Sequence, residues 1–120
     1  AGLEAVVAPR DHDYERSVYH TFVIQAQHRD ELKSYLADQD ISTAIHYPIP
    51  IHLQEAAQNL GYGVGSFPVT ENQASSILSL PIYPELTEEE IEYVVARIRN
   101  FYEMRKGDGS PVLLSTETIL

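Results

Sequence analysis

The stretch SLPIYPELTEEEIEYVVARIRNFY, residues 79–102, carries the strongest secondary-structure signal in the chain. Thr87 and Glu90 have the spacing of a capping box, and the acidic residues after Thr87 suit the positive end of a helix dipole. Apolar side chains then recur at the helical period, at Ile91, Val94, Val95, Ile98, Phe101 and Tyr102. The stretch therefore predicts a short core strand over 80–83 and an amphipathic helix over 87–105.

Strands and helices also alternate through the residues before this stretch. The elements that the pattern predicts there are strands over 3–9, 18–27 and 41–47, helices over 30–39 and 54–60, and a further helix that begins near residue 70. This order predicts a small sheet covered by helices on one side, in the α/β or α+β class.

Two of these elements have specific expectations attached. In the strand over 18–27, the more apolar face is formed by Val18, His20, Phe22, Ile24 and Ala26. Thr70 and Gln73 have the spacing of a second capping box. The helix that this box opens is expected to carry an inner stripe of Ala74, Ile77 and Leu78.

Composition limits the classes of partner. The chain has 120 residues, enough for one domain, and a formal net charge of −10, which repels nucleic acid and anionic membrane surfaces. Its apolar runs fall short of the ~20 residues that span a bilayer. The lack of cysteine excludes disulfides and thiolate metal sites and favours a cytoplasmic location. Because the sequence opens Ala1-Gly2-Leu3 without Met, we expect a piece of a longer protein.

The segment AIHYPIPIHL, residues 44–53, places His46, Tyr47 and His52 at the end of a predicted core strand. The prolines between them restrict the backbone, so little conformational entropy is left to lose when a ligand binds. The functional interpretation is therefore ligand contact. In the structural interpretation, the prolines only end the strand, Tyr47 packs under the loop, and both histidines have ordinary hydrogen-bond partners. The pattern alone leaves both interpretations open.

Other chemistry has weaker support in the sequence. A zinc site built on His46 and His52 needs a further ligand, and the nearest acidic residue downstream, Glu55, has no diagnostic spacing. Either imidazole has the chemistry of a general base, but neither a nucleophile motif nor a metal ligand set accompanies it. A standalone hydrolase is therefore the least favoured hypothesis.

A series of motifs extends over roughly the first hundred residues. They are VYHTFVI (18–24), the helix over 29–39, IHYPIPIHLQ (45–54), LGY (60–62), FPV (67–69), SLPIYPELT (79–87) and the helix to residue 101. In this order they resemble the C-terminal part of the DegT/DnrJ/EryC1/StrS family of sugar-nucleotide aminotransferases. Several motifs in one order are more specific than any of them alone.

The resemblance implies that residues 1–106 form the small C-terminal domain of a two-domain, homodimeric, fold-type I enzyme. That domain has a mostly antiparallel sheet of three or four strands covered by helices. Residues 107–120 have no counterpart and are expected to form a flexible tail. The resemblance also implies that a larger N-terminal domain carries pyridoxal phosphate on a Schiff-base lysine. The parent enzyme then transfers an amino group from an amino-acid donor, usually glutamate, to a keto-sugar nucleotide.

By the same resemblance, His46 and Tyr47 contact the nucleotide sugar, Pro48 supports them, and His52 is a further substrate contact. The lysines of the chain, Lys33 and Lys106, are expected in solvent, so we expect neither a catalytic residue nor a bound cofactor here. The isolated chain is then expected to be inactive. The alternative is a non-catalytic ligand-binding or protein-interaction module derived from the same fold.

Overall fold

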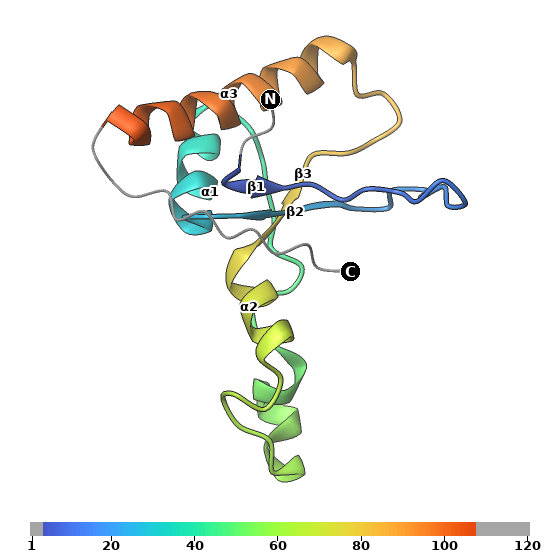
Figure 1. Cartoon of the computed structure of the whole chain (residues 1–120), viewed down its shortest axis with the longest axis vertical. Coiled ribbons are helices and arrows are strands. Elements are labelled where there is room, and N and C mark those ends of the chain that lie inside the picture. The colour runs from blue at the N-terminus through green and yellow to red at the C-terminus, as the bar shows by residue number, and fades with distance from the viewer. Residues whose placement is uncertain (1–3, 108–120) are drawn as a thin grey trace.

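The computed structural model describes residues 4–107, and these contain one antiparallel sheet (Figure 1). Its strands are β1 (Val6–Val7), β2 (Phe22–Ala26) and β3 (Ile77–Leu80), with β2 in the centre. Val6 pairs with Ala26 on one side of β2, and Phe22 pairs with Leu80 on the other. The small antiparallel sheet and the α/β class expected from the sequence are confirmed.

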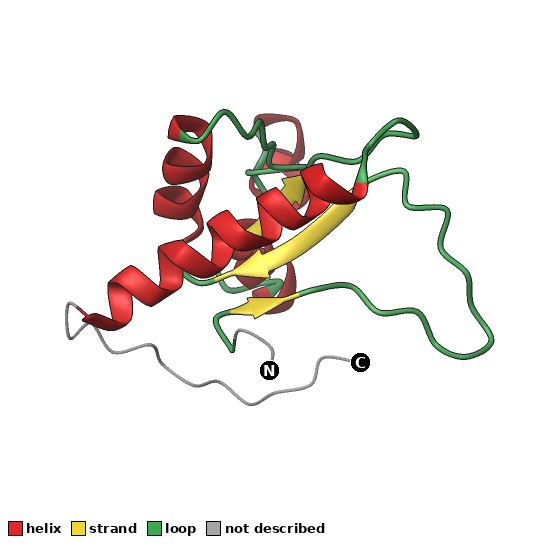
Figure 2. Ribbon diagram, turned by 90° about the horizontal axis from the view of Figure 1, so that it is seen from above, coloured by secondary structure: helices red, strands yellow, loops and turns green. Residues whose placement is uncertain are grey.

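The helices divide into two groups around this sheet (Figures 1 and 2). Helices α1 (Arg29–Asp38) and α3 (Glu88–Gly107) contact each other and cover the sheet. Helix α2 (Pro68–Ser76) and the two short 3₁₀ helices η1 (Ile51–Leu53) and η2 (Glu55–Leu60) extend away from it. We call residues 48–76 the lobe. The segment 44–53 therefore lies where the chain leaves the sheet and enters the lobe.

The core lies among the sheet, α1 and α3. Its largest fully buried side chains are Ile24, Leu32, Leu36, Leu78 and Tyr102. Burying an apolar side chain of this size contributes about 1.5–3 kcal/mol. The Tyr102 hydroxyl donates to the carbonyl oxygen of Gln27 over 2.6 Å, and burial raises the pKa of Tyr102 to about 12. This hydrogen bond ties α3 to the end of β2.

The capping box at the start of α3 is formed as predicted. The Thr87 N–H donates to Glu90 Oε2 at 2.9 Å, and the Glu90 N–H donates to Thr87 Oγ1 at 3.2 Å. The hydrogen bonds from Thr87 lower the pKa of Glu90. The predicted apolar stripe is buried from Ile98 onward, whereas Ile91 and Val95 are 46% and 40% exposed. The first half of α3 thus leaves apolar surface uncovered.

The strand predicted over 18–27 is wrong at its start. β2 begins only at Phe22, and Val18, which was expected on the apolar face, is 94% exposed. Tyr19 has a φ of 45°, a left-handed conformation that interrupts an extended chain. From Phe22 onward the predicted face is correct, since Ile24 and Ala26 are buried.

The strand predicted over 41–47 is absent. Only Ala44 pairs with β3, through an isolated antiparallel bridge to Ser79. Asp40 turns the chain at the end of α1 with a φ of 60°, and Ile41 is then buried in the core. After Ala44 the chain bends toward the lobe and leaves the sheet edge, so pairing ends after one bridge.

Helix α2 starts earlier than the sequence predicts. It begins at Pro68, whose ring suits the first turn of a helix because no donor is lost there. Thr70 therefore lies inside the helix, and its predicted capping box with Gln73 is wrong. In its place Glu71 reaches back and accepts the N–H of Phe67 at 3.3 Å.

The strand after α2 also starts earlier than predicted. α2 ends at Ser76, so Ile77 and Leu78, predicted on its inner stripe, belong to β3 instead. The strand predicted over 80–83 is shifted, because Pro81 lacks the N–H that further pairing requires. Tyr83 is consequently 46% exposed instead of in the core.

Helix α3 continues to Gly107, two residues beyond the predicted end. The rest of the predicted tail, 108–120, lies outside the described residues. Within residues 4–107, no helix is both long enough and apolar enough to span a membrane.

Candidate functional site

The segment 44–53 is fixed to the sheet at one point. Ala44 and Ser79 exchange both backbone hydrogen bonds, with N···O distances of 3.1 and 2.7 Å. Ser79 belongs to β3 and is opposite Val23 of β2, so β2 and the segment flank it on its two sides. The residues directly after Ala44 therefore start from a rigid position.

His46 is anchored by one ring nitrogen and open at the other. Its Nδ1 lies 2.8 Å from Oγ of Ser79, which is only 6% exposed. Its Nε2 has no hydrogen-bond partner among residues 4–107, and the residue is exposed. Tyr47 follows through a cis peptide bond and is 73% exposed, with its ring edge-on to His46 at 5.7 Å. Both rings are accessible to a ligand.

The prolines after these two residues direct the chain into the lobe. Pro48 is exposed, and Pro50 has an extended conformation with a φ of −52° and a ψ of 141° as it starts η1. The pyrrolidine rings restrict φ at both positions, so the segment has few alternative conformations. Gln54 adds a hydrogen bond from Nε2 to the carbonyl oxygen of Ile49 at 3.3 Å.

His52 lies in the interior of the lobe and apart from His46. Its Nε2 is 2.8 Å from Oε1 of Glu71, and its ring packs edge-on against Phe67 at 4.8 Å. The Glu71 carboxylate also accepts the N–H of Gly65 at 2.9 Å. The pKa of Glu71 is lowered because hydrogen bonds favour its ionised carboxylate. The backbone N–H of Gly65 has the largest effect, and His52 has the next largest. His52 and Glu71 thus connect η1, the turn at Gly65 and α2.

Sequence reasoning missed the partners of both histidines. Ser79 lies 33 residues from His46, and Glu71 lies 19 residues from His52. Neither partner has a local signal, because these contacts depend on the path of the chain between the sheet and the lobe. Among the described residues, no group of three His, Cys, Asp or Glu side chains is arranged to hold a metal ion.

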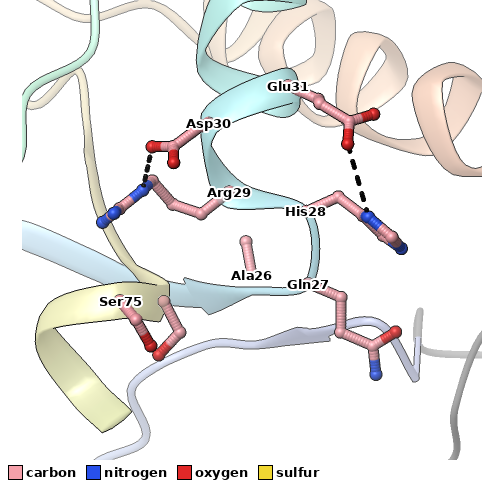
Figure 3. Close-up of a pocket in the computed structure, with 8 residues that line it drawn as sticks. Ala26, Gln27, His28, Arg29, Asp30, Glu31 and Ser75 are labelled. Carbon is pink, nitrogen blue, oxygen red and sulfur yellow. Dashed lines mark hydrogen bonds and ion pairs between the residues drawn. The ribbon is translucent and has the colours of Figure 1, made fainter. Parts of the chain in front are cut away.

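A hollow of about 350 Å³ lies elsewhere, between the end of β2, the start of α1 and the end of α2 (Figure 3). No residue of the segment 44–53 lines it. Arg29 at its wall is 9% exposed and donates to Oδ1 of Asp30 and to the carbonyl oxygens of Ala74 and Ile77 at 2.7, 3.1 and 2.9 Å. Arg29 therefore stabilises the junction of α2 and β3 through hydrogen bonds to both elements.

The chain belongs to the DegT/DnrJ/EryC1/StrS aminotransferase family, whose model matches residues 1–99. It is 44% identical over 99 residues to a pleiotropic regulatory protein of Geobacillus stearothermophilus, covering 82% of this chain and 27% of that protein. It is 40% identical over 89 residues to the dTDP-3-amino-3,6-dideoxy-alpha-D-galactopyranose transaminase of Aneurinibacillus thermoaerophilus, covering 74% of this chain and 24% of that enzyme.

Solved structures agree with this membership. The fold matches S. venezuelae DesV, crystallised with a ketimine intermediate, with a TM-score of 0.80 and 36% identity over 86% of this chain and 28% of that one. It also matches a family member from Brucella abortus with a TM-score of 0.75 and 35% identity, over 82% of this chain and 26% of that one. The chain thus spans about a quarter of the length of the relatives that it matches.

Proposed function

We propose that residues 1–106 are the C-terminal small domain of a pyridoxal phosphate-dependent enzyme that transfers an amino group from an amino acid, glutamate, to a keto-sugar nucleotide. Two observations support this: relatives with transaminase names act on dTDP- or UDP-linked sugars, and the chain spans about a quarter of their length. In this proposal the domain joins an N-terminal cofactor-binding domain of the same protein, and two copies form a cytoplasmic homodimer.

The arrangement of His46 and Tyr47 carries the proposal. Both side chains are exposed at the point where the chain leaves the sheet, and one nitrogen of His46 is already held by Ser79. A pair of polar rings on a restrained segment suits the recognition of a sugar nucleotide, because little ordering remains to be done on binding. Pro48 restrains the segment. His52, which the sequence predicted as a further substrate contact, is 8% exposed and hydrogen-bonded to Glu71, so its role in this proposal is to stabilise the lobe.

The residues of this chain do not fit an anchor for the cofactor. A lysine that forms an imine requires an enclosed site that tunes its amine. Lys33 is partly exposed at a shallow hollow shared with Ala37 and Asp40, and Lys106 is exposed near the end of α3. The anchor is therefore assigned to the N-terminal domain, and this chain supplies a wall of the substrate cleft.

Steady-state kinetics of the full-length enzyme test this proposal. His46→Ala and Tyr47→Phe should each raise the KM for the keto-sugar nucleotide by about tenfold, which corresponds to a loss of about 1.4 kcal/mol in binding free energy. The absorbance of the bound cofactor should not change. His28→Ala is the matched control. His28 is exposed and follows the end of β2, whereas Ser79, the partner of His46, is opposite Val23 near the start of β2. Unchanged kinetics in both site variants would remove the segment from the substrate cleft and favour a non-catalytic module.

A further inference from the structure

Ser79 is a buried residue that contacts His46, so it is placed to fix the orientation and tautomer of that ring. Its backbone N–H and carbonyl are both used in the bridge to Ala44, and the residue is 6% exposed. Arg29 secures the start of the same strand through the carbonyl oxygen of Ile77. The hydroxyl that contacts Nδ1 of His46 thus belongs to a residue with little freedom to move.

The direction of the Ser79–His46 hydrogen bond follows from the donors that are present. A serine hydroxyl has one proton to donate, and a buried donor without an acceptor costs about 1–3 kcal/mol. Among residues 4–107, Nδ1 of His46 is the one hydrogen-bond partner of this hydroxyl. If Nδ1 carried the proton instead, the Ser79 hydroxyl would have no acceptor among these residues. Donation from Ser79 to Nδ1 satisfies both groups.

We propose that Ser79 is a positioning residue, which holds His46 as the Nε2–H tautomer and thereby presents a hydrogen-bond donor to an acceptor oxygen of the nucleotide sugar. This inference rests on the function proposed above. The hydrogen bond on one ring nitrogen fixes which form the other nitrogen takes. In the opposite tautomer, Nε2 would offer a lone pair and repel the oxygens of a diphosphate or a sugar carbonyl.

The same contact also fixes the orientation of the ring. The two His46 ring nitrogens differ in surroundings, one against buried Ser79 and the other without a partner among the described residues. Without the Ser79 hydroxyl, the ring would be free to rotate and to exchange tautomers. Only part of the population would then present Nε2–H, so ligand binding would weaken in proportion to that fraction.

Nitrogen NMR of the full-length enzyme tests the tautomer directly. Histidines carry ¹⁵N, the His46 signals are assigned by their loss in His46→Gln, and spectra are recorded at about pH 8.5, above the ordinary imidazole range. We expect the Nε2–H tautomer of His46 in the wild type and a mixture of both tautomers in Ser79→Ala. The Nδ1–H tautomer in the wild type, or an unchanged spectrum in Ser79→Ala, would overturn the proposal.

Kinetics give the second readout. Ser79→Ala should raise the KM for the nucleotide sugar by about two- to fivefold, less than His46→Ala, and leave kcat within about twofold, because only part of the population then presents Nε2–H for ground-state binding. Ser79→Thr, which keeps the hydroxyl, should restore the tautomer and most of the affinity. Ser76→Ala is the matched control, since the Ser76 hydroxyl donates to Asn72 and does not contact His46.

The outcomes separate this inference from the proposed function. If His46→Ala leaves KM unchanged, the proposed substrate contact fails. If His46→Ala raises KM but Ser79→Ala does not, only the positioning role fails. If Ser79→Ala melts well below Ser76→Ala, a loss of stability would explain its kinetics, so the tautomer of His46 in the wild type becomes the deciding measurement. The Nδ1–H form there overturns the proposal.

Discussion

Nε2 of His52 lies 2.8 Å from Oε1 of Glu71, and this contact joins η1 to α2 across the lobe. The two side chains are 7% and 19% exposed. Glu71 also binds the backbone N–H groups of Gly65 and Phe67, so one carboxylate organises three parts of the lobe. The lobe has few other buried groups, since Ala57 and Ala74 are its buried apolar residues. Its stability should therefore depend on this polar cluster.

The stability of the lobe should fall in acid through Glu71. Its folded-state pKa is lowered, so its contribution is present above the unfolded value near 4.5 and is lost as the pH falls through the folded value. Glu71→Gln should lower the melting temperature by several degrees at pH 7, and the difference from the wild type should vanish in strong acid. Thermal melts across pH measure this, with exposed Glu55→Gln as the control. A difference that stays constant down to strong acid would contradict the role of the ionised carboxylate.

The two threonines in predicted capping boxes should respond differently to substitution. Thr87→Ala removes a cap that the structure contains and should cost about 1 kcal/mol of unfolding free energy. Thr70→Ala removes a hydroxyl inside α2 that caps nothing, and should change stability by less than about 0.5 kcal/mol. Urea unfolding of both variants compares them within one protein. Equal losses would mean that α2 begins at Thr70 after all.

Arg29 should be important for stability and difficult to replace. Arg29→Met keeps much of the side-chain volume but leaves the carbonyl oxygens of Ala74 and Ile77 without their shared donor, which should cost about 2–3 kcal/mol. Arg99→Met is the control, because Arg99 is exposed on α3 and should be nearly neutral. Chemical denaturation gives both values. A loss for Arg29→Met no larger than the control would show that the junction is held by packing alone.

Tyr102 should make the protein sensitive to alkali. Its folded-state pKa is raised to about 12, so its contribution is complete below the ordinary value near 10 and is lost as the pH rises through about 12. Tyr102→Phe should be less stable at neutral pH by about 1 kcal/mol, because the hydrogen bond to Gln27 is removed. It should also lose less stability than the wild type between about pH 10 and pH 12. Melts of the variant and of Tyr62→Phe, an exposed control, measure the difference.

Local signals in the sequence predicted the helices better than the strands. The Thr87–Glu90 capping box, helix α1 and the short helix predicted over 54–60 all follow from neighbouring residues, and the structure contains each of them, the last as the 3₁₀ helix η2. Gly61 has a φ of 76°, the left-handed conformation that ends a helix at little cost for glycine. Where adjacent residues determine the structure, pattern reasoning was sufficient.

Two errors involve local signals, since Pro68 begins α2 and Pro81 follows the end of β3, but others lie where distant contacts override local patterns. Ile77 and Leu78 have helical spacing with Ala74, but pairing with β2 draws them into a strand. Ala44 reaches the sheet edge for a single bridge because the chain must then enter the lobe. For the candidate site, the sequence predicted His46 and Tyr47 as ligand contacts but did not indicate Ser79, since a serine partner far along the chain leaves no pattern that sequence spacing can detect.

Equilibrium binding of the nucleotide sugar to the full-length enzyme tests the central claim most directly. Isothermal titration of the wild type and of His46→Ala, both saturated with cofactor, compares the two dissociation constants. We expect about tenfold weaker binding by His46→Ala with unchanged cofactor absorbance. Equal dissociation constants, or a loss of cofactor from the variant, would contradict a domain that contributes substrate contacts without anchoring the cofactor.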